Sequence, residues 1–339
     1  MAKTHHLRPE QGVHGFVSRD IEPVLTIDPD DTVVFQTLDS GWGAIEQSEN
    51  FSEPKEFSPR DLSCDVAQAL TGPVEIRSAR PGMALEIHLG RILPGNWGWS
   101  AGAALPAQLD ARLGIAGGAG GPPALIKVPR GAEATYRELQ PGRGIGVSRS
   151  GYQLRLNPFM GMMGMPLDIP GVQSTFPLTP CGGNLDCKNL IAGSVLYLPI
   201  AVPGGLFFTG DGHAVQGDGE VAGPALNCPM EVQMKFFLRK DLSLTLPRAR
   251  TVGGWLTFGF HPDLDEAAAI ATVEMVRLMT EQYELSSKEA LSLASLVVHL
   301  RVTQIVNGVR GVHALLPHGA LQSPESGQRK ICSHGKRRE

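Results

Sequence analysis

The chain lacks a strong charge of either sign. Its 339 residues include 30 Lys and Arg and 34 Asp and Glu, which gives a formal net charge of −4. A protein that binds nucleic acid or an anionic membrane through its electrostatic field needs clustered positive charge. We therefore expect neither nucleic acid nor membrane as a partner.

The sequence also lacks long apolar runs and a disulfide framework. A membrane-spanning helix needs about 18 consecutive apolar residues, and no stretch of the chain comes near that length. Residues 1–10 contain no apolar core of a secretory signal. Five cysteines are an odd number in a chain of this length and do not predict a set of paired disulfides. These absences favour a reducing environment, and we expect a cytoplasmic protein.

Glycine and proline are present in excess. The chain holds 41 Gly and 26 Pro without a collagen period or an internal repeat, which is typical of short strands joined by tight turns. Strand-like segments recur over 13–260, and helical rhythm appears late, over 265–284 and 286–298. We predict a mainly β (α+β) fold, a β-sandwich with a late helix pair packed on it. One domain is expected over 1–318, with a disordered tail at 319–339.

Two Gly- or Met-rich segments have weaker implications. The Gly-rich run at 117–123 does not follow a strand and open a helix, so it does not predict a phosphate-binding loop. The segment 157–166 carries four methionines, which fit either an adaptable pocket wall or a core loop.

The most informative segment is 181–220, where three polar pairs at a spacing of two lie between glycines. The pairs are Asn184/Asp186, Asp211/His213 and Asp218/Glu220. In an extended chain, residues i and i+2 project from the same face, so each pair can present two side chains to one point. Carboxylates, an imidazole and an amide in this pattern predict a divalent metal site or a hydrolytic acid–base site.

These residues resemble the signature of the acetamidase/formamidase family. Residues 182–188 look like its Gly-Gly-Asn-(Met/Leu)-Asp-Cys-Lys block, and 196–204, 210–214 and 217–220 follow in family order. The likeness extends more weakly over 30–310. It implies a jelly-roll-like β-sandwich, often oligomeric, that hydrolyses a short aliphatic amide to carboxylate and ammonia with metal in the site. We accordingly expect a small amide substrate and a homo-oligomer, a dimer or larger.

Amide hydrolysis needs a nucleophile, a stabilised oxyanion and an acid for the leaving amine. A bound Zn²⁺ serves the first two needs, because it lowers the pKa of its water to about 7 and polarises the carbonyl. Oxygen-rich ligation fits Ca²⁺ equally, at the same or a second site. The candidate residues are, for the metal, Asp186, Asp211, His213, Asp39 and His88; for acid–base catalysis, Glu220 or Asp218; and for the substrate amide, Asn184.

Several alternatives stay open at this point. His88 stands where many family members are expected to carry an acidic residue, which would alter the metal preference if that position is a ligand. Asp218 can serve as a turn residue, and a Cys187 thiolate is a rival nucleophile. The same site could hydrolyse a lactam or another cyclic amide, or the chain could be a non-catalytic β-sandwich binding protein.

Overall fold

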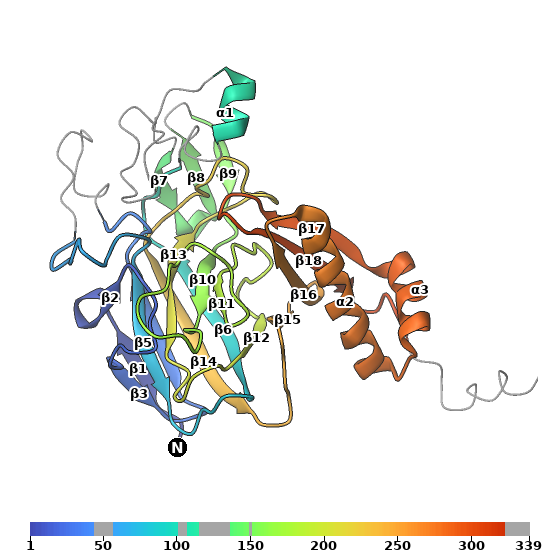
Figure 1. The fold of residues 1–339 in the computed structure, drawn as a ribbon. Coiled ribbons are helices and arrows are strands. Elements are labelled where there is room, and N and C mark those ends of the chain that lie inside the picture. Colours follow the sequence, from blue (N-terminus) through green and yellow to red (C-terminus); the bar gives the residue numbers. More distant parts are fainter. Residues whose placement is uncertain (44–56, 101–106, 115–135, 149–150, 323–339) are drawn as a thin grey trace, which may run out of the picture.

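The computed structural model describes residues 1–43, 57–100, 107–114, 136–148 and 151–322. These residues form mainly β structure in two large sheets and one small sheet (Figure 1). The prediction of a mainly β sandwich with a late helix pair is confirmed. None of the described helices combines the length and the hydropathy that a membrane span needs.

The larger sheet has nine strands and draws on both ends of the chain. In spatial order they are β1 (Thr4–Leu7), β4 (Thr32–Thr37), β14 (Met230–Arg239), β6 (Ala84–Pro94), β12 (Val195–Pro199), β15 (Arg248–Arg250), β16 (Gly254–His261), β18 (Arg310–Pro317) and β17 (His299–Gln304). The pair β1/β4 is parallel, and the other neighbours are antiparallel. One domain over 1–318 stays a prediction, with which this shared sheet is consistent.

The second sheet has six strands. They run in the order β11 (Gly182–Asn184), β10 (Phe159–Gly164), β13 (Phe207–His213), β5 (Leu70–Ile76) and β2 (Val13–His14), and β3 (Leu25–Ile27) also pairs with β5. The two large sheets bury a common core. Phe207 of β13 lies 6.0 Å from the ring of Phe35 and 5.2 Å from the ring of Phe236, both on the nine-stranded sheet. Edge-to-face contacts of this kind stabilise the sandwich beyond the area that they bury.

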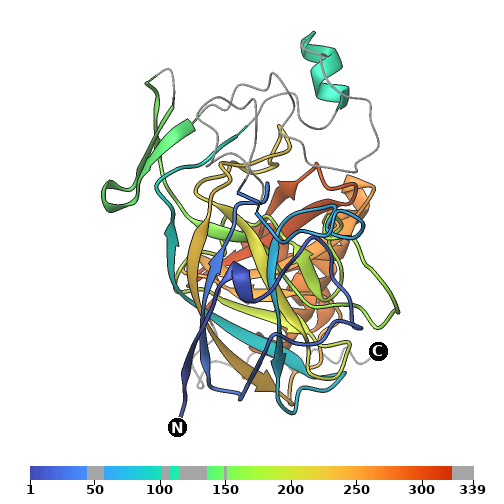
Figure 2. The ribbon, with the colours of Figure 1, turned by 90° about the vertical axis from the view of Figure 1, so that its left-hand side faces the viewer.

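Smaller elements complete the described chain. They are the 3₁₀ turns η1 (Pro9–Gln11) and η2 (Pro141–Arg143), the helix α1 (Ala107–Leu113), and the three-stranded sheet β7 (Tyr136–Gln140), β8 (Ile145–Ser148) and β9 (Gln153–Arg155). The three-stranded sheet stands away from the body of the sandwich (Figure 2).

The late helices α2 (Leu264–Tyr283) and α3 (Ser287–Val297) cover the β16–β18 end of the nine-stranded sheet (Figure 1). Asp263 caps α2 by accepting hydrogen bonds from the amides of residues 265 and 266, and Ser286 caps α3 by accepting one from the amide of residue 289. Gly259 of β16 allows α2 to approach closely, because a Cβ there would lie 2.0 Å from the carbonyl oxygen of Ala267.

The methionine-rich segment is a strand, so the core loop, one of the two interpretations left open, is wrong in its secondary structure. It forms β10, between β11 and β13, with Met160 and Met163 fully buried. Glycines make this possible, because a Cβ on Gly164 would lie 2.4 Å from the amide nitrogen of Gly183 on the neighbouring strand. Residues 101–106, 115–135 and 323–339, which include part of the Gly-rich excursion and most of the expected tail, lie outside the described residues.

His313 of β18 makes stability depend on pH. Its side chain is fully buried, Nδ1 lies 2.8 Å from Thr303 Oγ1, and Nε2 has no hydrogen-bond partner among the described residues. Burial lowers the pKa of His313 from 6.5 to about 4. Between these values the unfolded chain binds the proton and the native protein does not. We therefore expect the free energy of unfolding to fall by about 3 kcal/mol from this residue alone as pH drops from 6.5 to 4.

Urea unfolding at pH 7 and pH 4 measures this effect. The variant His313→Leu should lose this part of the pH dependence, whereas His299→Leu, at an exposed site on the adjacent strand, should keep it. Equal pH dependence in the two variants would contradict the assignment.

Candidate active site

The polar pairs of the sequence meet at one corner of the six-stranded sheet. Asn184 ends β11 and Asp186 follows it, while Asp211 and His213 end β13 on the other side of β10. Glu220 comes from the turn after β13. This turn is attached to the end of β17, where the amide of Gly219 donates to the carbonyl oxygen of Thr303. Both large sheets therefore contribute to the site.

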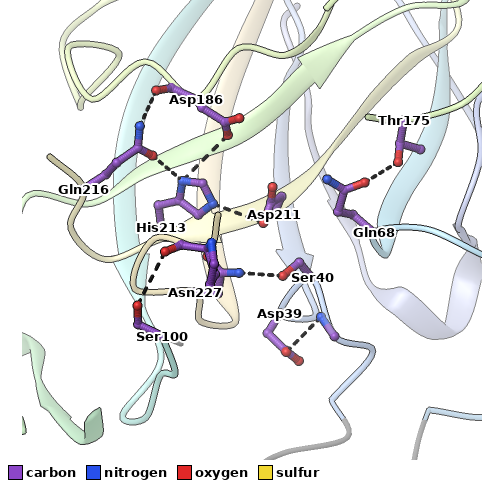
Figure 3. Close-up of polar contacts among 12 residues, drawn as sticks. Asp39, Ser40, Gln68, Ser100, Thr175, Asp186, Asp211, His213, Gln216 and Asn227 are labelled. Atoms are coloured by element: carbon purple, nitrogen blue, oxygen red, sulfur yellow. Dashed lines mark hydrogen bonds and ion pairs between the residues drawn. The ribbon is translucent and has the colours of Figure 1, made fainter. Parts of the chain in front are cut away.

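The central group comprises Asp186, His213 and Glu220, which are 1%, 1% and 7% exposed. One ligand atom from each of these side chains lies within 4.8 Å of the others. Asp211 adjoins the group, with Oδ1 3.1 Å from His213 Nε2, and Asp186 Oδ1 lies 3.9 Å from His213 Nδ1. Figure 3 shows the imidazole between the two aspartates. The structure thus brings four of the predicted residues together.

The backbone that aims these carboxylates is not extended. Asp186, Asp211 and Glu220 have φ angles of 46°, 53° and 45°, in the left-handed region that residues other than glycine rarely adopt. The two side chains of each pair are expected to project from one face of an extended strand. That expectation is wrong, because the backbone at these carboxylates is left-handed and not extended. Strained backbone of this kind is common where a fold holds functional side chains in place.

Gly161 provides the space between the two aspartates and the histidine. It is a buried residue of β10. A Cβ at this position would lie 2.8 Å from Asp186 Oδ1, from the carbonyl oxygen of Asp211 and from His213 Cε1. Any side chain here would enter the site.

Side-chain amides orient the carboxylates. The neighbours of Asn184 determine which end of its amide is the nitrogen. The nitrogen faces two carboxylate oxygens, Asp186 Oδ1 and Asp211 Oδ2, at 3.3 Å each, and the oxygen accepts from Asn307 Nδ2 at 2.9 Å. Asn307 also lies 2.6 Å from Asp186 Oδ2, and Gln68 Nε2 lies 3.3 Å from the Asn184 oxygen. Asn184 is 2% exposed and its polar atoms have protein partners, so it contacts the two aspartates. Its contact with a substrate amide stays a prediction.

The protonation of the site follows from its burial. Burial raises the pKa of Asp186 to about 7, with the charge of Asp211 adding to the effect and His213 opposing it. Burial also raises the pKa of Glu220 well above its usual range, and Asp186 and Asp211 reinforce this. For His213 burial acts to lower the pKa, but the nearby carboxylates outweigh it and raise the pKa. The group therefore carries excess negative charge that favours a proton or a cation.

These residues fit a divalent metal ion. Glu220 Oε2 is buried without a hydrogen-bond partner, and within the described part of the chain no lysine or arginine forms an ion pair with Asp186, Asp211 or Glu220. Buried charges are normally paired or bound to metals. One imidazole nitrogen with carboxylate oxygens is a donor set that suits zinc better than calcium, which takes 6–8 oxygens.

Asp39 lies near Asp211 but is not among the ligand atoms that cluster in this group. Its Oδ1 accepts from the amide of Gly43 at 2.6 Å, and its Oδ2 accepts from the amide of Gly41 at 3.0 Å and from Trp99 Nε1 at 2.8 Å. Burial raises the pKa of Asp39, and Asp211 contributes to the rise. Its role is to hold the turn over residues 39–43 and to orient Trp99.

His88 and Asp218 also lie apart from the group, which corrects two expectations. His88 alternates with the buried Ile87 and Leu89 on β6, so it faces outward, with Nε2 2.6 Å from Glu86 Oε1.

Asp218 Oδ1 lies 3.1 Å from Lys188 Nζ, and Asp218 Oδ2 lies 3.2 Å from Arg301 Nη1.

His88 therefore contacts Glu86, and Asp218 forms ion pairs with Lys188 and Arg301 near the surface. The histidine at position 88, where an acidic residue is expected in many family members, lies outside the group of Asp186, Asp211, His213 and Glu220. It therefore does not contribute a ligand atom to that group.

Cys187 is not suited to the role of nucleophile. Its side chain is fully buried, and burial raises the pKa of the thiol to about 12. A reactive cysteine needs a lowered pKa and access to substrate. Cys187 is part of the hydrophobic core.

Gly161, Gln216 and Asn307 belong to the site although the sequence pattern does not single them out. Gln216 lies inside the 210–220 block, and its position between two polar pairs was the available signal. Asn307 was recognisable only as part of a turn after a strand. Its contact with Asp186 spans 121 residues, which local patterns do not reveal.

Comparison with known proteins supports the fold and the family resemblance of the segment that carries the polar pairs. Residues 170–252 match the profile of the Acetamidase/Formamidase family. A putative formamidase of Schizosaccharomyces pombe is 54% identical over 41 residues, 12% of this chain and 10% of its own length. The formamidase of Methylophilus methylotrophus is 49% identical over 47 residues, 14% of this chain and 12% of its own length.

The likeness to a solved structure spans nearly the whole chain. The acetamidase from Bacillus halodurans superposes with a TM-score of 0.76 and 28% identity, covering 92% of this chain and 97% of that protein. The match to the two formamidases is local, whereas the fold match is global. The chain therefore resembles the acetamidase/formamidase family both in its signature residues and in its fold.

Proposed function

We propose that this chain, which shares the signature and the fold of the acetamidase/formamidase family, hydrolyses the C–N bond of short linear amides such as formamide and acetamide. The products are a carboxylate and ammonia. The observation that carries the proposal is the buried group of Asp186, His213 and Glu220, whose ligand atoms lie within 4.8 Å of one another beside Asp211.

A zinc ion would be held by Asp186, Asp211 and His213, the usual number of protein ligands for a catalytic zinc. When bound, it lowers the pKa of a water molecule and polarises the amide carbonyl. Asn184 supports this arrangement by donating to both aspartates. Calcium at this or a second site is less well supported, because a histidine takes part.

Glu220 is the residue that we assign to acid–base catalysis. Its Oε2 is buried and has no hydrogen-bond partner among the described residues, so this atom is available to hold a proton. The raised pKa of Glu220 favours the protonated form more than in an ordinary glutamate. A proton on Oε2 can be given to the nitrogen of the leaving amine, the step that makes ammonia a good leaving group.

The direct test is ammonia release by zinc-replete protein from formamide and acetamide, with a bicyclic lactam in the same panel. We expect release from a linear amide, and its loss in Asp211→Ala and after treatment with a chelator. Preference for the lactam would favour a cyclic-amide hydrolase. Folded protein that binds no metal and releases no ammonia from any of these substrates would favour a non-catalytic binding protein and overturn the proposal.

A homo-oligomer in the cytoplasm is the further expectation. Leu291, Leu296 and Leu300 are 54%, 77% and 51% exposed around α3 and the sheet edge at β17, and a second subunit would cover such leucines. Cys64, Cys181, Cys187 and Cys228 are free thiols, which suits a reducing compartment. Sedimentation velocity of the purified protein tests the oligomer, and a monomer at micromolar concentration would contradict it.

A further inference from the structure

Gln216 joins the two halves of the active site. It lies in the turn after β13, three residues beyond His213, and is 8% exposed. Its Nε2 donates to the carbonyl oxygen of Asp186 at 2.7 Å, and its Oε1 lies 2.9 Å from His213 Nδ1. Figure 3 shows this carboxamide between the backbone of Asp186 and the imidazole.

The contacts of Gln216 define which nitrogen of His213 carries a proton. A backbone carbonyl oxygen only accepts hydrogen bonds, so the Gln216 group facing Asp186 must be the NH₂. The group facing His213 is then the carbonyl oxygen, which also only accepts. His213 Nδ1 must therefore be the donor, and it carries a hydrogen.

By the same reasoning Nε2 donates to the Asp211 carboxylate in the metal-free protein, so its hydrogen is the one that a bound metal ion would replace. Nε2 faces Asp211, with Oδ1 at 3.1 Å. Ligand atoms bound about 2.0–2.2 Å from a tetrahedral zinc lie roughly 3.3 Å apart, so this pair can share one ion. Nδ1 is the nitrogen nearer to Asp186, at 3.9 Å, and without Gln216 it would compete with Nε2 for the metal.

We propose that Gln216 is a positioning residue that keeps the proton of His213 on Nδ1 and presents Nε2, together with Asp211, to the catalytic cation. The inference rests on the proposed function, because it assumes that the site binds a metal. It goes further by assigning the ligand nitrogen and the residue that selects it. Partners that hold the second nitrogen of a metal-binding histidine typically contribute a factor of about 10–100 to metal affinity.

A merely structural role for Gln216 predicts a different outcome. Its hydrogen bond to Asp186 also ties the turn after β13 to the segment after β11, and its bond to His213 ties that turn to the end of β13. Loss of both would lower the stability of the fold. That role requires no change in the nitrogen that binds zinc. The readouts must therefore report on the ring of His213 and on zinc affinity as well as on stability.

The experiment compares wild type with Gln216→Leu, Gln216→Glu and the control Gln173→Leu. Gln173 is distant in sequence and also bridges backbone groups, donating to the carbonyl oxygens of residues 167 and 169. Gln216→Glu keeps an acceptor for Nδ1–H and is the conservative variant. In each protein, the zinc dissociation constant is measured by competition with a chelator. Long-range ¹H–¹⁵N spectra of histidine-labelled, zinc-loaded protein identify the bound nitrogen of His213.

In wild type and Gln173→Leu we expect zinc on Nε2 and a proton on Nδ1. Gln216→Leu should raise the zinc dissociation constant about 10–100-fold and redistribute the bound nitrogen, and Gln216→Glu should restore the Nε2 form. A Gln216→Leu protein with zinc on Nε2 and affinity within twofold of wild type would overturn the proposal. If Gln216→Leu does not fold, zinc on Nδ1 in wild type or in Gln216→Glu overturns it.

Failure of the proposed function can be recognised separately. If wild type binds no zinc and releases no ammonia, the metal site itself is wrong. The metal-free proteins still report the hydrogen bond. The Nδ1 proton should then give a slowly exchanging downfield resonance in wild type and Gln173→Leu that disappears in Gln216→Leu. Its absence from wild type contradicts the positioning role directly.

Discussion

Replacing Glu220 with Gln is expected to lower kcat/KM for formamide about 10²–10⁴-fold, the usual contribution of general acid–base catalysis. The side chain keeps its size, but it can no longer hold and release a proton. Because we assign the metal to Asp186, Asp211 and His213, the variant should retain its zinc. Ammonia-release kinetics and elemental analysis of the same preparation provide the two readouts.

Asp218→Asn is the matched control, since the sequence alone made Asp218 an equal candidate. Its carboxylate forms ion pairs with Lys188 and Arg301 and is about one-third exposed. We expect kcat/KM to change less than threefold in this variant. Loss of zinc from Glu220→Gln would show that Glu220 is a ligand, and full activity would remove it from the mechanism.

The same variant should be more stable without metal. Burial, Asp186 and Asp211 raise the pKa of Glu220, so at a pH above its raised pKa ionised Glu220 destabilises the native state relative to the unfolded chain. A neutral amide removes that penalty. Chemical unfolding of metal-free wild type and Glu220→Gln at high pH should show a higher free energy of unfolding in the variant, with the gain shrinking as pH falls.

Adding a single methyl group at Gly161 is expected to lower kcat/KM about 10–100-fold. The new Cβ would lie 2.8 Å from Asp186 Oδ1, the Asp211 carbonyl oxygen and His213 Cε1, so these groups must shift by several tenths of an ångström. Misplacement of reacting groups on the ångström scale is enough for an effect of this size. Overpacking should also lower the free energy of unfolding by about 1–3 kcal/mol.

Gly253→Ala is the control for Gly161→Ala. A Cβ on Gly253 would meet only Thr251 Oγ1, at 3.9 Å, and neither glycine has a φ angle in the left-handed region. Comparison of the two therefore isolates the effect of the occupied space. Unchanged zinc affinity and kcat/KM in Gly161→Ala would show that the site tolerates a Cβ and would contradict the close approach of these three groups.

The fold could be predicted to the extent that local patterns determine it. The β-rich class follows from the glycine and proline content, and the two late helices follow from their periodicity and from the caps Asp263 and Ser286. The methionine segment was missed because β10 is buried on both faces, so it shows no alternation. Its strand identity depends on the neighbours β11 and β13, which only the tertiary structure supplies.

The candidate site was predictable in its residues but not in its geometry. Asp186, Asp211, His213 and Glu220 were identified, because they cluster between glycines in two short blocks. The same signal could not separate Glu220 from Asp218, since the choice depends on which side of the turn each occupies.

Asp39 and His88 were proposed as ligands because their residue types were suitable. Their partners, Trp99 and Glu86, lie 60 and 2 residues away and were not visible as partners in the sequence.

The left-handed backbone at the three site carboxylates has a consequence for protein engineering. Glycine at residue 186, 211 or 220 would relieve an unfavourable φ angle and remove a buried carboxyl group in one step. Directed evolution for heat resistance alone would therefore enrich changes at these positions and recover thermostable, inert proteins. Mutant libraries designed to raise thermal stability without loss of activity should keep these three residues unchanged and vary other positions.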